Sequence, residues 1–130
     1  MNEHPNVERV RKGYAAFADA DTEALNEFFA EDAVWYDRGH NPLGGEFHGR
    51  EAIFSRFLDL YMATDGTIKI ELVAAFADDT FAVAIEHMTA QRKGKTRDRH
   101  DVTVYQVKNG KVVRVWNYPE DPYEADDFLS

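Results

Sequence analysis

The chain has 130 residues, of which 44% are hydrophobic and 30% are charged. This composition is typical of a globular protein, and the length suits one domain with one core, so we expect residues 1–130 to form a single domain. The formal net charge of −9 argues against nucleic acid and anionic membranes as partners, because both attract Lys and Arg.

No cysteine is present, which excludes a disulfide framework, a thiol nucleophile and a zinc–thiolate site. The first five residues lack the basic and apolar blocks of a signal peptide. No apolar run is long enough to span a bilayer. These features lead us to expect a cytoplasmic protein.

Three helices are predicted in the first half of the chain. Apolar residues recur at three- and four-residue steps over residues 5–18, and Pro5 suits the first turn, where its missing N–H costs nothing. Asp21 is a typical N-cap for a second, shorter helix. A third helix is predicted over residues 50–62, with Ile53, Phe54, Phe57, Leu58 and Tyr61 on one face.

The remaining segments predict strands and turns. Residues 33–37 favour a short strand on which Trp35 and Asp37 share a face, and the four glycines and the proline of residues 39–49 indicate a loop. Two long strands are expected over residues 67–77 and 80–92. A hairpin follows over residues 97–118, turning at Asn109-Gly110. Residues 119–130 form an acidic tail in which Phe128 and Leu129 are available to dock.

This order of elements predicts an α+β fold with the helices on one face of an antiparallel sheet. Long twisted strands must curve, and three N-terminal helices cannot fill the whole concave side. We therefore expect a cone-shaped sheet that encloses a pocket, where small molecules usually bind. Apolar residues at both parities of the hairpin predict that the outer face is covered too, by a second copy in a homodimer.

Four segments carry a resemblance to a known family: AAFADAD (residues 15–21), FAEDAVWYD (29–37), HGREAI (48–53) and NGKVV (109–113). With the order of elements, they resemble the nuclear transport factor 2-like superfamily, particularly its SnoaL-like branch. The resemblance implies the cone fold and, commonly, a homodimer paired through the outer sheet face. The superfamily includes ketosteroid isomerases, polyketide cyclases, dehydratases, epoxide hydrolases and non-catalytic binding domains, and the fold does not choose among them.

Asp37 matches the position of the general-base aspartate in ketosteroid isomerases. A carboxylate in an apolar cavity has a raised proton affinity, which suits proton abstraction beside a carbonyl. On this hypothesis, Asp37→Asn abolishes proton transfer and leaves folding intact. The alternative is that Asp37 ends the strand and hydrogen-bonds the glycine loop after it.

The resemblance does not extend to a complete isomerase site. It places Gly13 rather than Tyr14 at the isomerase tyrosine, and Thr103 where isomerases have a second acid. Tyr14 is then expected to be a core aromatic with its hydroxyl at the pocket rim. The aspartate pair of epoxide hydrolases is not matched either, because the corresponding strand carries Glu86 and Met88, and Asn117 stands near the second aspartate.

Glu86 has two possible environments. It shares parity with Ala84 and Met88, so it is a second buried carboxylate near Asp37 if that face is the pocket, and otherwise it faces solvent or pairs with Arg99. Two close carboxylates split their proton affinities and can act as an acid and a base. His87 and His100 lack metal-ligand spacing, so we expect no metal and no cofactor.

The sequence therefore favours an acid–base enzyme of the isomerase, cyclase or dehydratase type, acting on a hydrophobic carbonyl-bearing or cyclic compound. Asp37 would move the proton, with Glu86, His100 or Asp101 assisting. The expected pocket residues are Tyr14, Trp35, Phe54, Phe57, Met88, Thr103, Tyr105 and Asn117. The alternative is a non-catalytic ligand-binding or dimerisation domain of the same fold.

Overall fold

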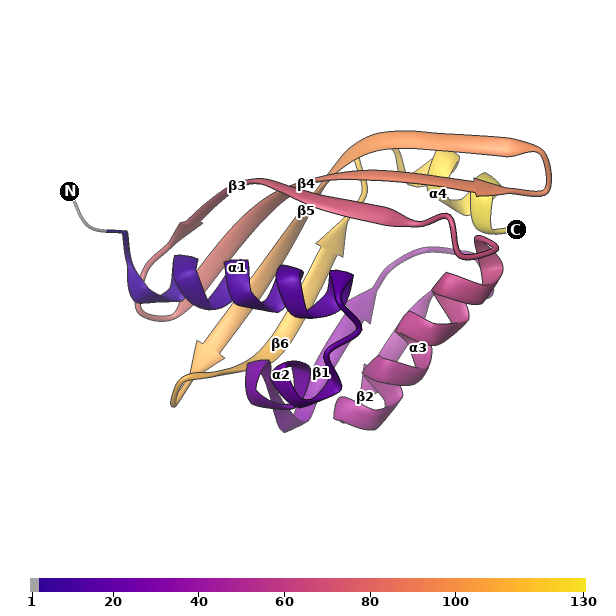
Figure 1. The fold of residues 1–130 in the computed structure, drawn as a ribbon. Coiled ribbons are helices and arrows are strands. Elements are labelled where there is room, and N and C mark those ends of the chain that lie inside the picture. The colour runs from indigo at the N-terminus through magenta and orange to yellow at the C-terminus, as the bar shows by residue number, and fades with distance from the viewer. Residues whose placement is uncertain (1–2) are drawn as a thin grey trace.

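The computed structural model describes residues 3–130, which form four helices and six strands (Figure 1). In chain order these are α1 (Pro5–Ala18), α2 (Thr22–Phe28), β1 (Phe29–Asp37), β2 (Gly45–His48), α3 (Arg50–Ala63), β3 (Lys69–Ala77), β4 (Phe81–Arg92), β5 (Lys95–Lys108), β6 (Lys111–Tyr118) and α4 (Pro122–Leu129). The fold is α+β with a curved, unclosed sheet, which confirms the predicted class. Among residues 3–130, no helix is both long and apolar enough to cross a membrane.

The strands form one sheet in the order β2-β1-β6-β5-β4-β3. All neighbours are antiparallel except β1 and β6, which run parallel. This pair was not foreseen in the predicted antiparallel sheet. Its register places Asp37 opposite Asn117. The ends of β1 and β6 therefore lie together at the place where the chain leaves for the glycine loop and for α4.

The helices pack closely because of local sequence choices. Asp21 caps α2 by accepting a hydrogen bond from the backbone of Ala24, as predicted. A Cβ at Gly13 would lie 2.7 Å from the ring of Phe28, so only glycine allows α1 and α2 this separation. The hairpin turn is also confirmed, with Asn109 and Gly110 at φ angles of 54° and 78°.

Two elements were missed in the sequence. Residues 45–48 form the edge strand β2 rather than loop, and three of these four residues are exposed, so they carry no clear alternating pattern. Helix α4 lies in the tail, where Asp121 caps the helix and Pro122 occupies its first turn. The helix was not predicted because the segment is acidic and Phe128 is its one buried residue.

The two faces of the sheet differ in what covers them. On β4, Ala82, Ala84 and Glu86 face the helices and are buried. Residues of the opposite parity form an apolar row across five strands, in which the sheet register pairs each residue with the next: Phe76, Val83, Val104, Trp116 and Tyr36. The last four are half-buried. Phe76 is 62% exposed.

Candidate functional site

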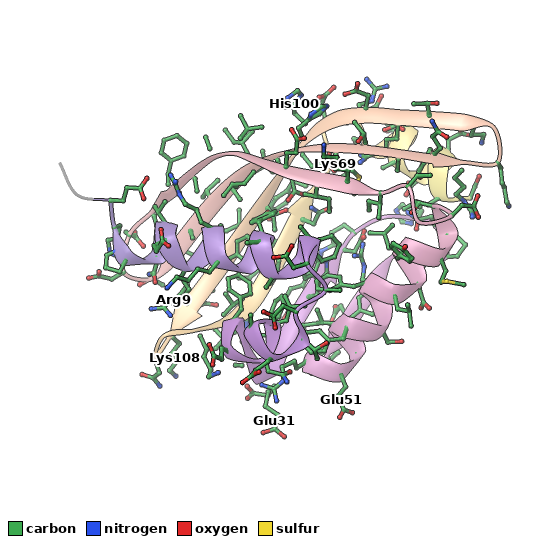
Figure 2. All side chains as sticks on the ribbon, viewed as in Figure 1. Arg9, Glu31, Glu51, Lys69, His100 and Lys108 are labelled. Atoms are coloured by element: carbon green, nitrogen blue, oxygen red, sulfur yellow. The ribbon has the colours of Figure 1, made fainter. Side chains whose placement is uncertain are left out.

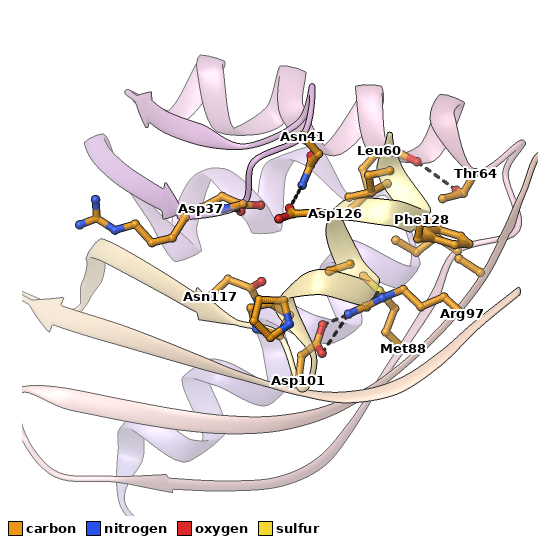
Figure 3. A pocket seen from close by; sticks show the side chains of 18 of the residues that line it. Asp37, Asn41, Leu60, Thr64, Met88, Arg97, Asp101, Asn117, Asp126 and Phe128 are labelled. Atoms are coloured by element: carbon orange, nitrogen blue, oxygen red, sulfur yellow. Dashed lines mark hydrogen bonds and ion pairs between the residues drawn. The ribbon is translucent and has the colours of Figure 1, made fainter. Parts of the chain in front are cut away.

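Two cavities lie between the helices and the concave side of the sheet. The first, here the aromatic chamber, has a volume of about 70 Å³, and its walls include Phe17, Phe28, Phe29, Trp35 and Phe57. The second, the C-terminal chamber, has a volume of about 100 Å³ and is bounded by α4 through Ala125, Phe128 and Leu129 (Figure 3). Four residues line both chambers and form the waist between them: Arg56, Leu60, Met88 and Asn117.

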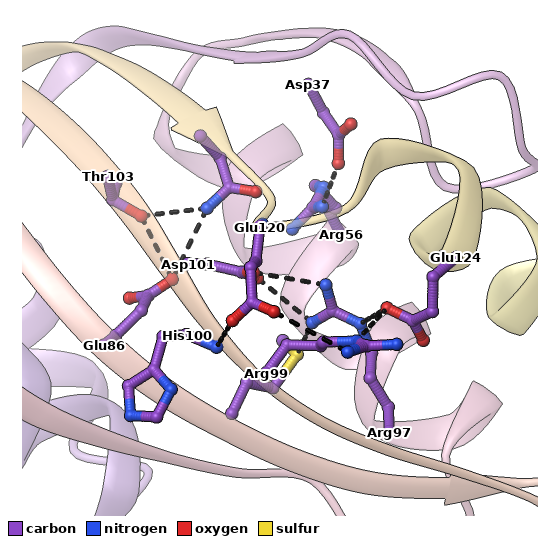
Figure 4. A network of polar contacts seen from close by, with 12 residues as sticks. Asp37, Arg56, Glu86, Arg97, Arg99, His100, Asp101, Thr103, Glu120 and Glu124 are labelled. Carbon is purple, nitrogen blue, oxygen red and sulfur yellow. Dashed lines mark hydrogen bonds and ion pairs between the residues drawn. The ribbon is translucent and has the colours of Figure 1, made fainter.

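Glu86 is the central polar residue of the aromatic chamber. Its side chain comes from the middle of β4, and the residue is 4% exposed. Tyr14 donates to Oε2 at 2.5 Å. Thr103 and Asn117 donate to Oε1 at 3.1 Å and 3.4 Å, as Figure 4 shows. The carboxyl group is therefore held by three donors from three different elements.

The donors form a connected network. Asn117 also donates to the hydroxyl of Thr103 at 2.9 Å, and the hydroxyl of Tyr105 donates to that of Tyr14 at 2.9 Å. Such a network fixes the orientation of Glu86 because each group is held by another. The inner face of β4 next to Glu86 carries Ala84, which takes little space beside the carboxyl group.

Burial changes the acidity of this group. The pKa of Glu86 is raised to about 7, mainly by removal from water and also by the nearby charge of Asp101, against the hydrogen bonds from Tyr14 and Thr103 and the charge of Arg97, which lower it. Burial also raises the pKa values of Tyr14 and Tyr105, so both stay protonated donors at neutral pH. A carboxyl group with a pKa near 7 can take and return a proton at neutral pH.

Asp37 has a different environment. It lines the C-terminal chamber, and its side chain is 13% exposed. Oδ1 accepts from the backbone N–H of Gly39 at 2.8 Å, and Oδ2 accepts from Arg56 at 2.5 Å (Figure 4). Asp37 thus makes the loop contact of the alternative hypothesis, and the structure does not place it in the chamber that contains Glu86.

Asp101 also lines the C-terminal chamber, where it binds Arg97 and the backbone of the segment that leads into α4. Its carboxylate accepts from two nitrogens of Arg97, at 3.0 Å and 3.2 Å, and from the backbone of Glu120 at 3.0 Å. Arg97 in turn pairs with Glu124 of α4 at 3.0 Å. Both oxygens of Asp101 are engaged in fixing the helix that bounds the chamber.

His100 lines neither chamber. Side chains alternate along β5, so Asp101 points inward and His100 outward. Figure 2 shows His100 on the side of the sheet away from α1 and α3. Its ring stacks on that of His87 at 4.8 Å. The alternative in which Glu86 pairs with Arg99 is not observed: Glu86 contacts Tyr14, Thr103 and Asn117, and Arg99 pairs with Glu120 and Glu124.

Most of the expected pocket residues come together. Those that line the aromatic chamber are Tyr14, Trp35, Phe57, Met88, Tyr105 and Asn117. Thr103 contacts Glu86 and is almost fully buried. Phe54 packs in the core against Phe29 and Phe57 and lines neither chamber.

Sequence reasoning missed Arg56. This residue is 6% exposed and lies over the rings of Trp35 and Phe47, at 5.3 Å and 5.5 Å. It stands three residues after Ile53, on the helical face that packs inward. A charged residue at this spacing was the signal that could have revealed it.

Comparisons with known proteins agree with this architecture. A family model described as a SnoaL-like domain matches residues 10–115. An uncharacterised protein of Mycobacterium tuberculosis (strain ATCC 25618 / H37Rv) is 28% identical over 129 residues, 98% of each chain. The structure of Bal32a from a soil-derived mobile gene cassette matches with a TM-score of 0.92 and 37% identity over 96% of each chain. A putative SnoaL-like polyketide cyclase from Jannaschia sp. CCS1 matches with a TM-score of 0.81 and 15% identity, over 100% of this chain and 97% of that one, which shows the shared fold.

Proposed function

Because this chain belongs to the SnoaL-like domain family, we propose that it is an acid–base enzyme of the isomerase, cyclase or dehydratase type. Its substrate is a hydrophobic carbonyl-bearing or cyclic compound that binds in the aromatic chamber. The polyketide cyclase named among the similar structures supports this class of reaction only through the shared fold.

Glu86 is the residue that moves the proton in this proposal. The observation that carries it is a buried carboxyl group with a pKa near 7, held by three hydrogen-bond donors beside an aromatic chamber. As a carboxylate it removes a proton from the carbon next to the carbonyl, and as a carboxylic acid it returns the proton to another atom. Tyr14, Thr103 and Asn117 orient it.

In this proposal Asp37 has a structural role, and it is not the general base that the resemblance implied. Its oxygens bind Arg56 and the glycine loop, and this arrangement fixes the wall of the C-terminal chamber. These contacts of Asp37 also favour the second candidate, a non-catalytic domain that binds a small hydrophobic molecule in the same cavity. Glu86 is then only a buried hydrogen-bonding residue.

Deuterium exchange separates the two candidates. The enzyme is incubated in D₂O with 2-acetylnaphthalene, 4-acetylbiphenyl and 2-tetralone, and NMR follows the protons beside each carbonyl. We expect exchange whose rate rises with pH through a midpoint near 7. Glu86→Gln should abolish it. Glu71→Gln, which changes an exposed carboxylate of β3, is the matched control and should not alter it. Binding without exchange between pH 5 and 9 would establish the non-catalytic candidate.

We also propose a homodimer formed through the outer sheet face. The apolar row from Phe76 to Tyr36 extends across five strands, with Phe76 exposed and the other four residues half-buried. Val73, Phe81 and Tyr118 are exposed as well, and apolar residues that gather on a surface usually mark a contact with another protein. A second copy of the sheet would cover the row. The helices and both chambers would remain on the far side of each protomer.

A further inference from the structure

Arg56 presents an unused hydrogen-bond donor to the cavity. Its Nη2 pairs with Asp37, and its Nε donates to the carbonyl of Leu43 at 3.3 Å. Within residues 3–130, Nη1 has no hydrogen-bond partner, and it is not among the fully buried unpaired atoms. Arg56 lines both chambers, and its unpaired Nη1 retains accessible surface.

Asn117, which also lines the waist, has a hydrogen-bond acceptor that is free within residues 3–130. Its Nδ2 is directed to Glu86 and Thr103, which leaves Oδ1 without a donor among the described residues. The waist therefore lies directly beside the proton-transferring group. It combines one free donor and one free acceptor with two apolar side chains, Leu60 and Met88. Methionine adapts its shape readily, so the waist can admit a ligand that passes between the chambers.

Charge selects what Arg56 can bind. The C-terminal chamber is lined by three aspartates and three arginines. Arg56 and Arg97 are each paired with an aspartate, and Arg38 is exposed and lies over the ring of Tyr36. An anion entering this chamber would give up its hydration without gaining, in the described part of the chain, a buried and unpaired arginine as its counter-ion. A neutral carbonyl oxygen can accept the free N–H at a much smaller desolvation cost.

We propose that Arg56 binds the carbonyl oxygen of the substrate, and that the substrate is a neutral, elongated carbonyl compound spanning both chambers. This inference rests on the proposed function. The apolar rings occupy the aromatic chamber, and the remainder passes the waist beneath α4. When Glu86 takes the proton from the neighbouring carbon, the C–H electron pair forms a C=C bond and the carbonyl π pair moves to oxygen. Arg56 stabilises that oxygen until Glu86 returns the proton.

Three probes of matched shape test the recognition step without relying on turnover. Calorimetry compares 4-acetylbiphenyl with 4-ethylbiphenyl, which lacks the acceptor, and with biphenyl-4-carboxylate, which is anionic. We expect the ketone to bind about tenfold or more tighter than the hydrocarbon, as is typical of a hydrogen bond from a charged donor. The carboxylate should bind more weakly than the ketone.

Two variants assign the preference to Arg56. Asp37→Asn/Arg56→Met removes both charges of the pair, while Asp37→Asn alone keeps Arg56 as the matched control. The double variant should bind the ketone and the hydrocarbon equally, with hydrocarbon affinity unchanged as evidence of folding. The single variant should still prefer the ketone. Equal binding of ketone and hydrocarbon by the wild type, tighter binding of the carboxylate, or no binding of the ketone up to its solubility limit would each overturn the proposal.

The Glu86→Gln variant keeps the two proposals distinguishable. It should retain the preference for the ketone, because Arg56 is unchanged. If the wild type shows that preference without deuterium exchange, the catalytic function fails and Arg56 remains the recognition residue of a binding site. If exchange occurs without the preference, Glu86 is catalytic and the role of Arg56 is refuted.

Discussion

The hydroxyl of Tyr14 on α1 donates a hydrogen bond of 2.5 Å to Oε2 of Glu86 on β4, although 72 residues separate them in the chain. This bond connects the helical layer to the centre of the sheet. It also stabilises the charged form of Glu86 against the effect of burial. The position of one helix therefore contributes to the acidity of the candidate catalytic group.

Tyr14→Phe should raise the pKa of Glu86 above its value of about 7, because the variant removes a donor to the carboxylate and leaves the group buried. The midpoint of the exchange rate against pH should move upward, and carboxyl ¹³C shifts titrated by NMR should show the same movement. Tyr105→Phe is the control, since its hydroxyl reaches Glu86 only through Tyr14. A midpoint that stays in place or falls would show that Tyr14 does not tune Glu86.

Glu86 should also make stability depend on pH. Its folded-state pKa of about 7 lies above the ordinary value of 4.5, so the folded protein binds this proton more tightly than the unfolded chain. The resulting stabilisation is complete below pH 4.5 and is lost as pH rises through 7, by at most about 3 kcal/mol. Urea unfolding of wild type and Glu86→Gln at pH 4.5, 6 and 8 measures it. A difference between the two that does not vary with pH would contradict the assigned pKa.

Asp37→Asn should clearly lower the free energy of unfolding, while it should slow deuterium exchange much less than Glu86→Gln does. The variant leaves Arg56 buried without its anion, and breaking a buried ion pair from one side typically costs about 3 kcal/mol or more. Chemical denaturation measures this loss. Exchange per folded molecule should fall far less than in Glu86→Gln. The opposite pattern, unchanged stability with exchange abolished, would return the role of base to Asp37.

The proposed dimer through the outer sheet face predicts the mass of the protein in solution. Light scattering at micromolar concentration should give about twice the chain mass of 14.9 kDa. Val104→Glu should shift it to the monomer, because Val104 lies in the middle of the apolar row. Leu58→Glu places the same charge at an exposed apolar residue of α3 and should leave the dimer intact. A wild-type mass of one chain would exclude this interface.

Periodicity and turn chemistry were enough to predict the layers of the fold, because helical stripes and the Asn109-Gly110 turn are local signals. The environment of Glu86 could not be decided in the same way. Alternation shows which residues share a face but not which face meets the helices, and both parities of β4 are apolar around Glu86. Only the packing of α1 against the sheet resolves the choice.

The contacts within the candidate site could not be predicted from local sequence patterns. The sequence placed Asp37 and Trp35 on one face, but the partner of Asp37 is Arg56, 19 residues away on another element. Nothing in either segment indicates that they meet. Helix α4 was missed because its acidic composition resembles a solvated tail. Its place over the C-terminal chamber depends on ion pairs with Lys95 and Arg97 on β5.

The parallel pairing of β1 with β6 has a consequence for biosynthesis. Val34 pairs with Arg114, about 80 residues later, so β1 has no neighbour on that side until almost the whole chain has left the ribosome. Contacts this distant in sequence form slowly, since a long loop must first be closed. We expect the nascent chain to leave the β6-facing edge of β1 unpaired through most of translation, although β2 can pair with the other edge early, and we expect the cavity to be completed only in the last stage of folding.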